Sequence, residues 1–380
     1  MMKNNRRRWL ALAALCTLVF MEGGWWAERH WDSLARQDRM HAAVAPDSRS
    51  AYVASTAPGT IMVLSLTENR QIDRFDVSGH VSGMVFHPDG RTAYVLTAGE
   101  GDGSGHLHVV DAASSSVRTT IPVGRCASSI AISSDGRTLT IAHVSPQDIC
   151  MSLIDTATLA VSETLTHTEF KLAADGVLAR DGGHVYMPLC GLCPGDAGQP
   201  AFTLLAVNTL HDDKPDMMEL GGVWSHPFDV SADRRQIAFY TKDLEPDARW
   251  GITLVDASSG AITKASALAA ASNFLDLRFS SDGKWVYVLQ ALGPDSHVTL
   301  FTVDAASGRE HRRLALDARA HRMADTPDAS RILVMDRSAE AVTVIDTHKN
   351  MAVATVKLDM PLAMRAWARV KSDIWTRAHQ

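Results

Sequence analysis

The chain has 380 residues and a formal net charge of −6, with acidic and basic residues interspersed. This length exceeds the size at which a single hydrophobic core usually stops growing, whereas a repeat fold lengthens by adding modules. The sequence has no basic stretch that would give the positive face needed to bind nucleic acid, so we expect no nucleic-acid partner. The composition therefore favours a soluble-type repeat protein over a nucleic-acid-binding one.

The first 27 residues differ from the rest and resemble an export signal. Lys3 and the arginines Arg6, Arg7 and Arg8 precede an uncharged run at 9–21. A charged region followed by an apolar one is typical of such signals, and residues 5–10 also resemble a twin-arginine signal. Because the arginine cluster stays inside, we expect the body of the protein in the periplasm.

The sequence leaves open whether this segment is cleaved. Ala27 is small, but Trp25 stands where signal cleavage requires a small residue. Residues 9–27 have about the length of a bilayer span, with tryptophans near both ends, although Glu22 counts against a deep span. We expect a cleaved signal or a helical inner-membrane anchor at 1–27, followed by a linker at 28–40.

One unit recurs seven times in the rest of the chain: a strand, a turn with an aspartate, a second strand, a variable loop, and two further strands. Asp-Gly between two strands favours a hairpin because both residues tolerate positive φ. Successive turn aspartates are separated by 42 (89 − 47) to 52 (233 − 181) residues. They are Asp47, Asp89, Asp135, Asp181, Asp233, Asp282 and Asp328.

The strands around these turns are rich in β-branched and aromatic residues. The second strand is AYVA at 51–54 and AYVL at 93–96, and the third is LHVVD at 107–111 and TVID at 343–346. Such runs are typical of half-buried strands, and four strands in about 40 to 50 residues form a propeller blade. The sequence therefore predicts an all-β, seven-bladed β-propeller over 41–370 and a tail at 371–380.

These units resemble the YVTN (YncE-like) propeller repeat, which has an Asp-Gly turn, a Tyr-Val strand, a Val-x-Val-Ile-Asp strand and a last strand ending near Gly. The last piece is seen at 120–124. The resemblance covers nearly the whole body and implies the architecture, but the matching residues build blades and indicate no chemistry. The first unit lacks the turn Gly and has Thr67 in place of the third-strand Asp, and the fourth has Asn208 there.

A binding face is predicted opposite the turn aspartates, and we call it the top face. Loops that enter the first strand of each unit share this face with the loops between second and third strands. Residues seven to ten positions before each turn Asp should line the channel mouth, and Trp and Arg are common at binding hot spots. The candidate ligand- or partner-binding residues are His80, Trp224, His226, Arg319 and His321.

Four cysteines of the body also fall near top-face loops. In an oxidising compartment we expect two disulfides, Cys126–Cys150 and Cys190–Cys193. The Cys-x-x-Cys at 190–193 lacks the His after the second Cys that haem attachment requires, because Pro194 is there. Redox and metal-binding roles of this loop remain alternatives to a structural disulfide.

No catalytic motif stands out, and we expect neither a catalytic residue nor a metal site nor a cofactor. The leading hypothesis is a non-catalytic periplasmic propeller that binds a protein partner or small ligand. YVTN-like propellers also resemble propeller subunits of quinoprotein or quinohemoprotein amine dehydrogenases, which implies an oxidoreductase complex with a redox subunit or cytochrome as partner. A third hypothesis, a lactonase-like or haem-d1-like enzyme, requires channel ligands that the scattered histidines do not clearly supply.

Overall fold

The structure of the protein is a computed structural model. It describes residues 40–54, 59–99, 103–144, 149–167, 177–178, 184–190, 202–208, 216–220, 223–242, 250–268, 273–291, 298–316, 320–336 and 340–359. The predicted export segment, the linker and the predicted tail lie outside these ranges. Within the described residues, no helix has the length and apolar character needed to cross a membrane.

The described strands form seven four-stranded antiparallel sheets, each built from four consecutive strands. Sheets 1 to 3 contain β1 His41–Val44, β2 Ser50–Ala54, β3 Thr60–Ser65, β4 Arg70–Asp76; β5 His80–Phe86, β6 Thr92–Ala98, β7 Ser104–Asp111, β8 Ser116–Arg125; and β9 Ala127–Ile132, β10 Thr138–Val144, β11 Ile149–Asp155, β12 Val161–His167. Sheets 4 and 5 contain β13 Val177–Leu178, β14 His184–Cys190, β15 Phe202–Asn208, β16 Asp216–Leu220; and β17 Val223–Val230, β18 Gln236–Lys242, β19 Trp250–Asp256, β20 Ile262–Ala267. Sheets 6 and 7 contain β21 Asn273–Phe279, β22 Trp285–Ala291, β23 Val298–Asp304, β24 Glu310–Leu316; and β25 Ala320–Asp325, β26 Arg331–Asp336, β27 Ala341–Asp346, β28 Met351–Lys357.

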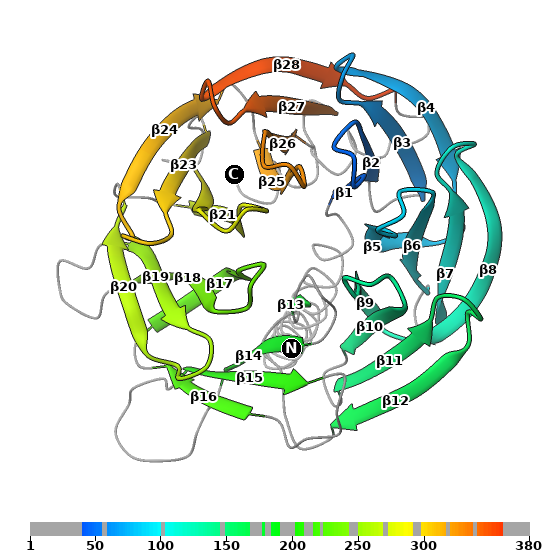
Figure 1. The fold of residues 1–380 in the computed structure, drawn as a ribbon, viewed down its shortest axis with the longest axis horizontal. Coiled ribbons are helices and arrows are strands. Elements are labelled where there is room, and N and C mark those ends of the chain that lie inside the picture. Colours follow the sequence, from blue (N-terminus) through cyan, green and yellow to red (C-terminus); the bar gives the residue numbers. More distant parts are fainter. Residues whose placement is uncertain are drawn as a thin grey trace, which may run out of the picture. The chain divides into compact units, whose positions relative to one another are not determined.

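The first strands of the sheets, here called the inner strands, contact one another in a closed series. Strand β1 contacts β5, β5 contacts β9, and the series continues through β13, β17, β21 and β25 back to β1. Figure 1 shows the sheets arranged around a common centre, with the inner strands nearest to it and the fourth strands outermost. The fold of the described residues is therefore all-β and propeller-like.

The tight turns explain why each sheet is a meander. In the first hairpin, the amide of Ser48 donates to the carbonyl of Ala45, and Asp47 Oδ1 accepts from the amide of Arg49. The same bonds recur after β5, β9, β17, β21 and β25, where the turn aspartate accepts from the amide two positions on. These are the predicted Asp turns; the predicted fourth turn, at 179–182, lies outside the described residues.

Apolar side chains pack between neighbouring sheets and form the core. The second and third strands are largely buried, and every residue of β3 is buried. One cluster joins sheet 1 to sheet 2 through Tyr52, Ile61 and Phe86, and another joins sheet 6 to sheet 7 through Leu289 and Val334. Burial of such side chains is worth about 1.5–3 kcal/mol each, so the sheets are stable only as a group.

Sheets 7 and 1 meet in a seam between the two ends of the described body. Leu64 and Val344 belong to one buried cluster there. Polar bonds cross the same seam: the Asp328 amide donates to Ser48 Oγ at 3.2 Å, and the Asp359 amide donates to Gln71 Oε1 at 2.8 Å. Residues 360–370, the predicted end of the propeller, lie outside the described residues.

Candidate functional site

The top face lies where the inner strands begin, because the Asp turns follow their last residues. Two of the predicted binding residues are found there with described side chains. His80 is the first residue of β5, opposite Ala98, and His321 lies in β25 at an irregularity between Ala320 and Arg322. Both side chains are half-buried. The turn spacing therefore placed these two histidines on the expected end of their strands.

A third histidine at the same end was missed by the sequence reasoning. His41 opens β1 opposite Ala54 and is half-buried. It precedes its turn aspartate by six positions (47 − 41), just outside the window of seven to ten. Since β25 contacts β1 and β1 contacts β5, the fold places His321, His41 and His80 at the top ends of three consecutive inner strands.

The remaining predicted residues belong to other parts of the ring. Trp224 lies in β17 opposite Thr241, and His226 falls in the irregular step between Ser225 and Phe228. Strand β21 separates β17 from β25, so these two positions are not adjacent to the histidine group. Arg319 lies outside the described residues.

No metal centre is formed by the described residues. Among them, no three or more histidine, cysteine, aspartate or glutamate side chains converge as metal ligands would. The arrangement of His321, His41 and His80 on separate strands therefore provides a polar rim and not a ligand cage in this conformation.

A charged network lines the inner strands of sheets 5, 6 and 7. Asp229 Oδ2 of β17 accepts from the amide of Phe279 in β21 at 2.8 Å. Asp276 Oδ2 of β21 accepts from the amide of Met323 in β25 at 2.9 Å. Asp325 of β25 in turn accepts from the Ser281 hydroxyl. Each carboxylate thus joins its own sheet to a neighbouring one.

Arg278 completes this network on β21. Its Nε is buried and lies 3.8 Å from Asp276 Oδ2, although the side chain as a whole is 40% exposed and that of Asp276 only 3%. Burial lowers the pKa of Arg278, but the negative charges of Asp276, Asp229 and Asp325 more than offset this, so its pKa is raised. The guanidinium therefore stays charged next to three inner-strand carboxylates.

The predicted Cys126–Cys150 disulfide is absent from the structure. Cys126 precedes β9 and Cys150 lies in β11, and strand β10 separates them. Two strand spacings of about 4.8 Å exceed the Cα separation of about 7 Å that a disulfide tolerates. The sequence placed both residues near one end of sheet 3, but the disulfide prediction did not account for the width of the second strand of the unit, which lies between them. The predicted Cys190–Cys193 bond lies outside the described residues.

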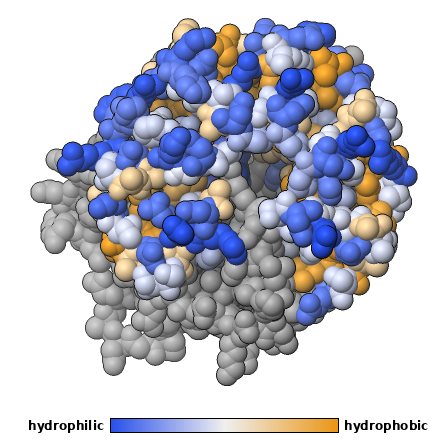
Figure 2. Space-filling view, in the orientation of Figure 1, coloured by the Kyte–Doolittle hydropathy of each residue, from blue (hydrophilic) through white to orange (hydrophobic). Residues whose placement is uncertain are grey.

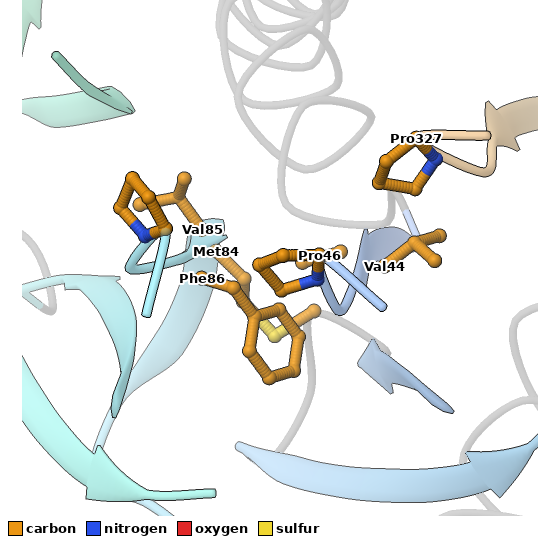
Figure 3. A pocket seen from close by; sticks show the side chains of 8 residues that line it. Val44, Pro46, Met84, Val85, Phe86 and Pro327 are labelled. Carbon is orange, nitrogen blue, oxygen red and sulfur yellow. The ribbon is translucent and has the colours of Figure 1, made fainter. Parts of the chain in front are cut away.

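The opposite face, here called the turn face, has an apolar depression that the sequence analysis did not predict. Its cavity volume is about 360 Å³. It is lined by Ala43, Val44, Pro46, Met84, Val85, Phe86, Pro88 and Pro327. Figure 3 shows Pro46 between the side chains of β5 on one side and Pro327 on the other. The three prolines directly precede the turn aspartates of sheets 1, 2 and 7, a sequence signal that could have identified it.

Hydrophilic residues predominate on the face shown in Figure 2, with hydrophobic residues scattered between them. The walls of the apolar depression on the turn face offer no polar side chain to orient a ligand. Specific recognition needs such groups among the apolar contacts. The candidate site remains the top face, where histidines stand at the strand ends.

Comparisons with known proteins give no family. No family model matches the chain, and no curated protein matches it. Among solved structures, the chain is similar to Kuenenia stuttgartiensis Hydrazine Synthase, at 16% sequence identity and a TM-score of 0.44. That match covers 83% of this chain and 86% of the other. A likeness this distant carries no argument about activity.

Proposed function

We propose that this chain is an exported, seven-bladed β-propeller of the YVTN-like type that binds a protein partner or a small ligand at its top face. The seven four-stranded sheets and the closed series of inner-strand contacts support the architecture. The arginine-rich start and the apolar run at 9–21 support export to the periplasm. The function itself is binding without chemistry of its own.

One observation carries the binding proposal: three consecutive inner strands begin with or near a histidine. His321, His41 and His80 are half-buried, so their rings combine an apolar body with polar nitrogens at the mouth. Imidazoles donate and accept hydrogen bonds. A mouth edged by three such groups suits a polar or anionic group on the partner, whereas the turn-face depression is apolar.

Site-specific photo-crosslinking tests the binding face. A photoreactive amino acid replaces His41 or His80 on the top face. In matched control variants it replaces Asp89 or Asp135 on the turn face. The cells are irradiated, and the crosslinked adducts are identified by mass spectrometry. We expect one defined adduct from the top-face positions only. The same adduct from the turn-face positions, or adducts from these alone, would overturn the proposal.

Two further measurements complete this test. For the partner so identified, His41→Ala and His80→Ala should each weaken binding by about 1 kcal/mol or more, with unchanged thermal unfolding. A reporter enzyme active only outside the cytoplasm, fused after residue 40, should be active. An inactive fusion, with a cytoplasmic reporter working at the same junction, would contradict export.

A further inference from the structure

Two buried histidines hold the linkers that lead into the mouth of sheets 2 and 3. His108 is 2% exposed and His143 is 5% exposed. His108 Nε2 lies 3.3 Å from the carbonyl oxygen of Ser78, and His143 Nδ1 lies 3.0 Å from that of Arg125. Ser78 is two residues before His80, and Arg125 directly precedes Cys126 and β9. His108 therefore fastens the connection between β4 and β5, and His143 fastens the end of β8 where the chain passes to β9. Residues 77–79 and 124–126 are called the linkers here.

The hydrogen bonds fix the neutral form of His143. A carbonyl oxygen only accepts, so Nδ1–H must donate to Arg125; Nε2 then accepts from the hydroxyl of Ser152, which is 3.0 Å away and 7% exposed. The ring also packs on the linker backbone, because a Cβ at Gly124 would lie 3.0 Å from its Cε1. The linker backbone therefore approaches the ring so closely that a side chain at position 124 would crowd it.

His108 is held in the same way in the adjacent sheet. Nε2–H donates to the carbonyl of Ser78, and Nδ1 accepts from the hydroxyl of Thr120 at 3.0 Å. Thr97 Oγ1 lies 3.2 Å from Nε2 and completes the enclosure. The two histidines lie on different strands, β7 and β10, but have the same partners. In each, one ring nitrogen donates to a linker carbonyl and the other accepts from a hydroxyl.

A second proton fits poorly in either site. In His143 it would turn Ser152 from donor to acceptor and leave a positive charge in a buried space. Burial lowers the pKa of both imidazoles, and the hydrogen bond to the linker carbonyl partly offsets this in each. At His108 the pKa is lowered further by His106, whose ring lies 6.3 Å away. Around His143 the titratable neighbours on the adjoining elements are Arg125, Cys126 and Cys150, none of which is an acid.

We propose that His108 and His143 form an acid-sensitive clamp, whose protonation releases the linkers at 77–79 and 124–126 and so loosens the top mouth between sheets 1, 2 and 3. The charged rings leave their enclosures, and the linker carbonyls lose their donors. This clamp rests on the proposed function, since it would make the conformation of the top-face binding site depend on pH. The clamp itself involves no partner.

Hydrogen exchange of the full-length protein tests the clamp. Amide exchange is followed by mass spectrometry at pH 7.5 and pH 5, with correction for the intrinsic rate at each pH. In the wild type, the peptides spanning 77–79 and 124–127 should lose protection by about tenfold or more at pH 5. The outer strand β4 is an internal reference that should keep its protection. Equal protection of the linkers at both pH values would overturn the proposal.

Neutral substitutions separate protonation from general acid sensitivity. Gln retains an amide donor and carries no titratable group, so in His143→Gln the 124–127 linker should exchange at the same corrected rate at both pH values, while the 77–79 linker still responds. His108→Gln should give the reverse pattern. His87→Gln is the matched control, because His87 Nε2 also lies 3.1 Å from a carbonyl, that of Gly136, but in a half-buried site beside Asp89.

The outcomes distinguish the clamp from the binding function. A His143→Gln variant whose 124–127 linker still loses protection at pH 5 would exclude His143 as the sensor, whatever the top face binds. A linker that responds as expected in a protein whose top-face positions give no crosslink would support the clamp and contradict the binding proposal.

Discussion

The inner strands of sheets 1–3 and those of sheets 5–7 occupy equivalent places in the fold but contact their neighbours through different chemistry. Strands β1, β5 and β9 have no acidic residue and no arginine or lysine; their sequences are HAAV, HVSGMVF and ASSIAI. Strands β17, β21 and β25 carry Asp229, Asp276, Arg278, Arg322 and Asp325. One repeat geometry is therefore compatible with two ways of joining sheets.

On the uncharged side, neighbouring sheets approach closely. A Cβ at Gly83 would lie 2.9 Å from Ile130 Cγ2, and buried imidazoles bond the linker carbonyls. On the charged side, carboxylates accept backbone amides across the sheet boundary. Charge-assisted bonds of this kind are about twice as strong as neutral ones. The first kind of joint depends on shape and the second on charge, and each can be broken separately.

The largest effect is expected from Asp276→Ala. This change removes the acceptor of two amides, those of Leu277 and Met323, and a carboxylate that lies 3.8 Å from Arg278 Nε. Leaving two amides and the Arg278 guanidinium without this buried carboxylate should lower the free energy of unfolding by about 3 kcal/mol. Urea denaturation followed by tryptophan fluorescence measures it. Asp276→Asn keeps one acceptor oxygen and should lower the free energy of unfolding less, and Asp73→Ala, at an exposed position, should change it little. Equal losses of stability in all three variants would contradict the role of the network.

The joints between sheets 1, 2 and 3 should instead be destabilised by added side-chain volume. Gly83→Val introduces a branched side chain against Ile130, whose own χ1 is restricted, and such overpacking costs about 2 kcal/mol. The double variant with Ile130→Ala should recover part of the loss, because it removes the opposing methyl group. If the loss of stability in the double variant equals the sum of the losses in the two single variants, in the same denaturation experiment, β5 and β9 are not joined by this contact.

The two sides should also differ in their response to mild acid. Burial lowers the pKa of His108 and His143, so between their ordinary pKa of about 6.5 and the lower folded value the unfolded chain binds more protons. Stability should be constant above about pH 7.5 and fall as the pH drops below about 6.5, by at most about 1.4 kcal/mol per pH unit for each histidine. Denaturation midpoints measured from pH 8 to pH 5 should fall in the wild type and change less in the double variant His108→Gln with His143→Gln.

The architecture followed from the sequence because its signals are local. An aspartate turn between two β-branched runs specifies a hairpin by itself, and its recurrence showed where each sheet begins. The joints between sheets involve residues about fifty positions apart, as in the bond between Asp229 and Phe279, and no local pattern announces them. The Cys126–Cys150 error has a different cause, since the predicted second strand, β10, already lay between the two residues and its width was not considered. His41 was missed because β1 is short, so its offset from the turn is smaller than in other units.

The smallest effect concerns the turns, which both sides share and which therefore provide a baseline for the comparison. Gly283 in sheet 6 has φ of +72° and Ala329, at the equivalent place in sheet 7, has φ of +57°. This left-handed conformation costs a residue with a Cβ about 1 kcal/mol relative to glycine. Ala329→Gly should therefore raise the denaturation midpoint slightly, and Gly283→Ala should lower it by a similar amount. No atom lies within 4 Å of a Cβ added at Gly283, so conformation alone acts there. A matched pair of opposite, small shifts would show that the turns of sheets 6 and 7 are interchangeable and respond to backbone conformation alone. A loss in both variants would mean that the Ala329 methyl packs in the seam between sheets 7 and 1, where Asp328 already bonds Ser48.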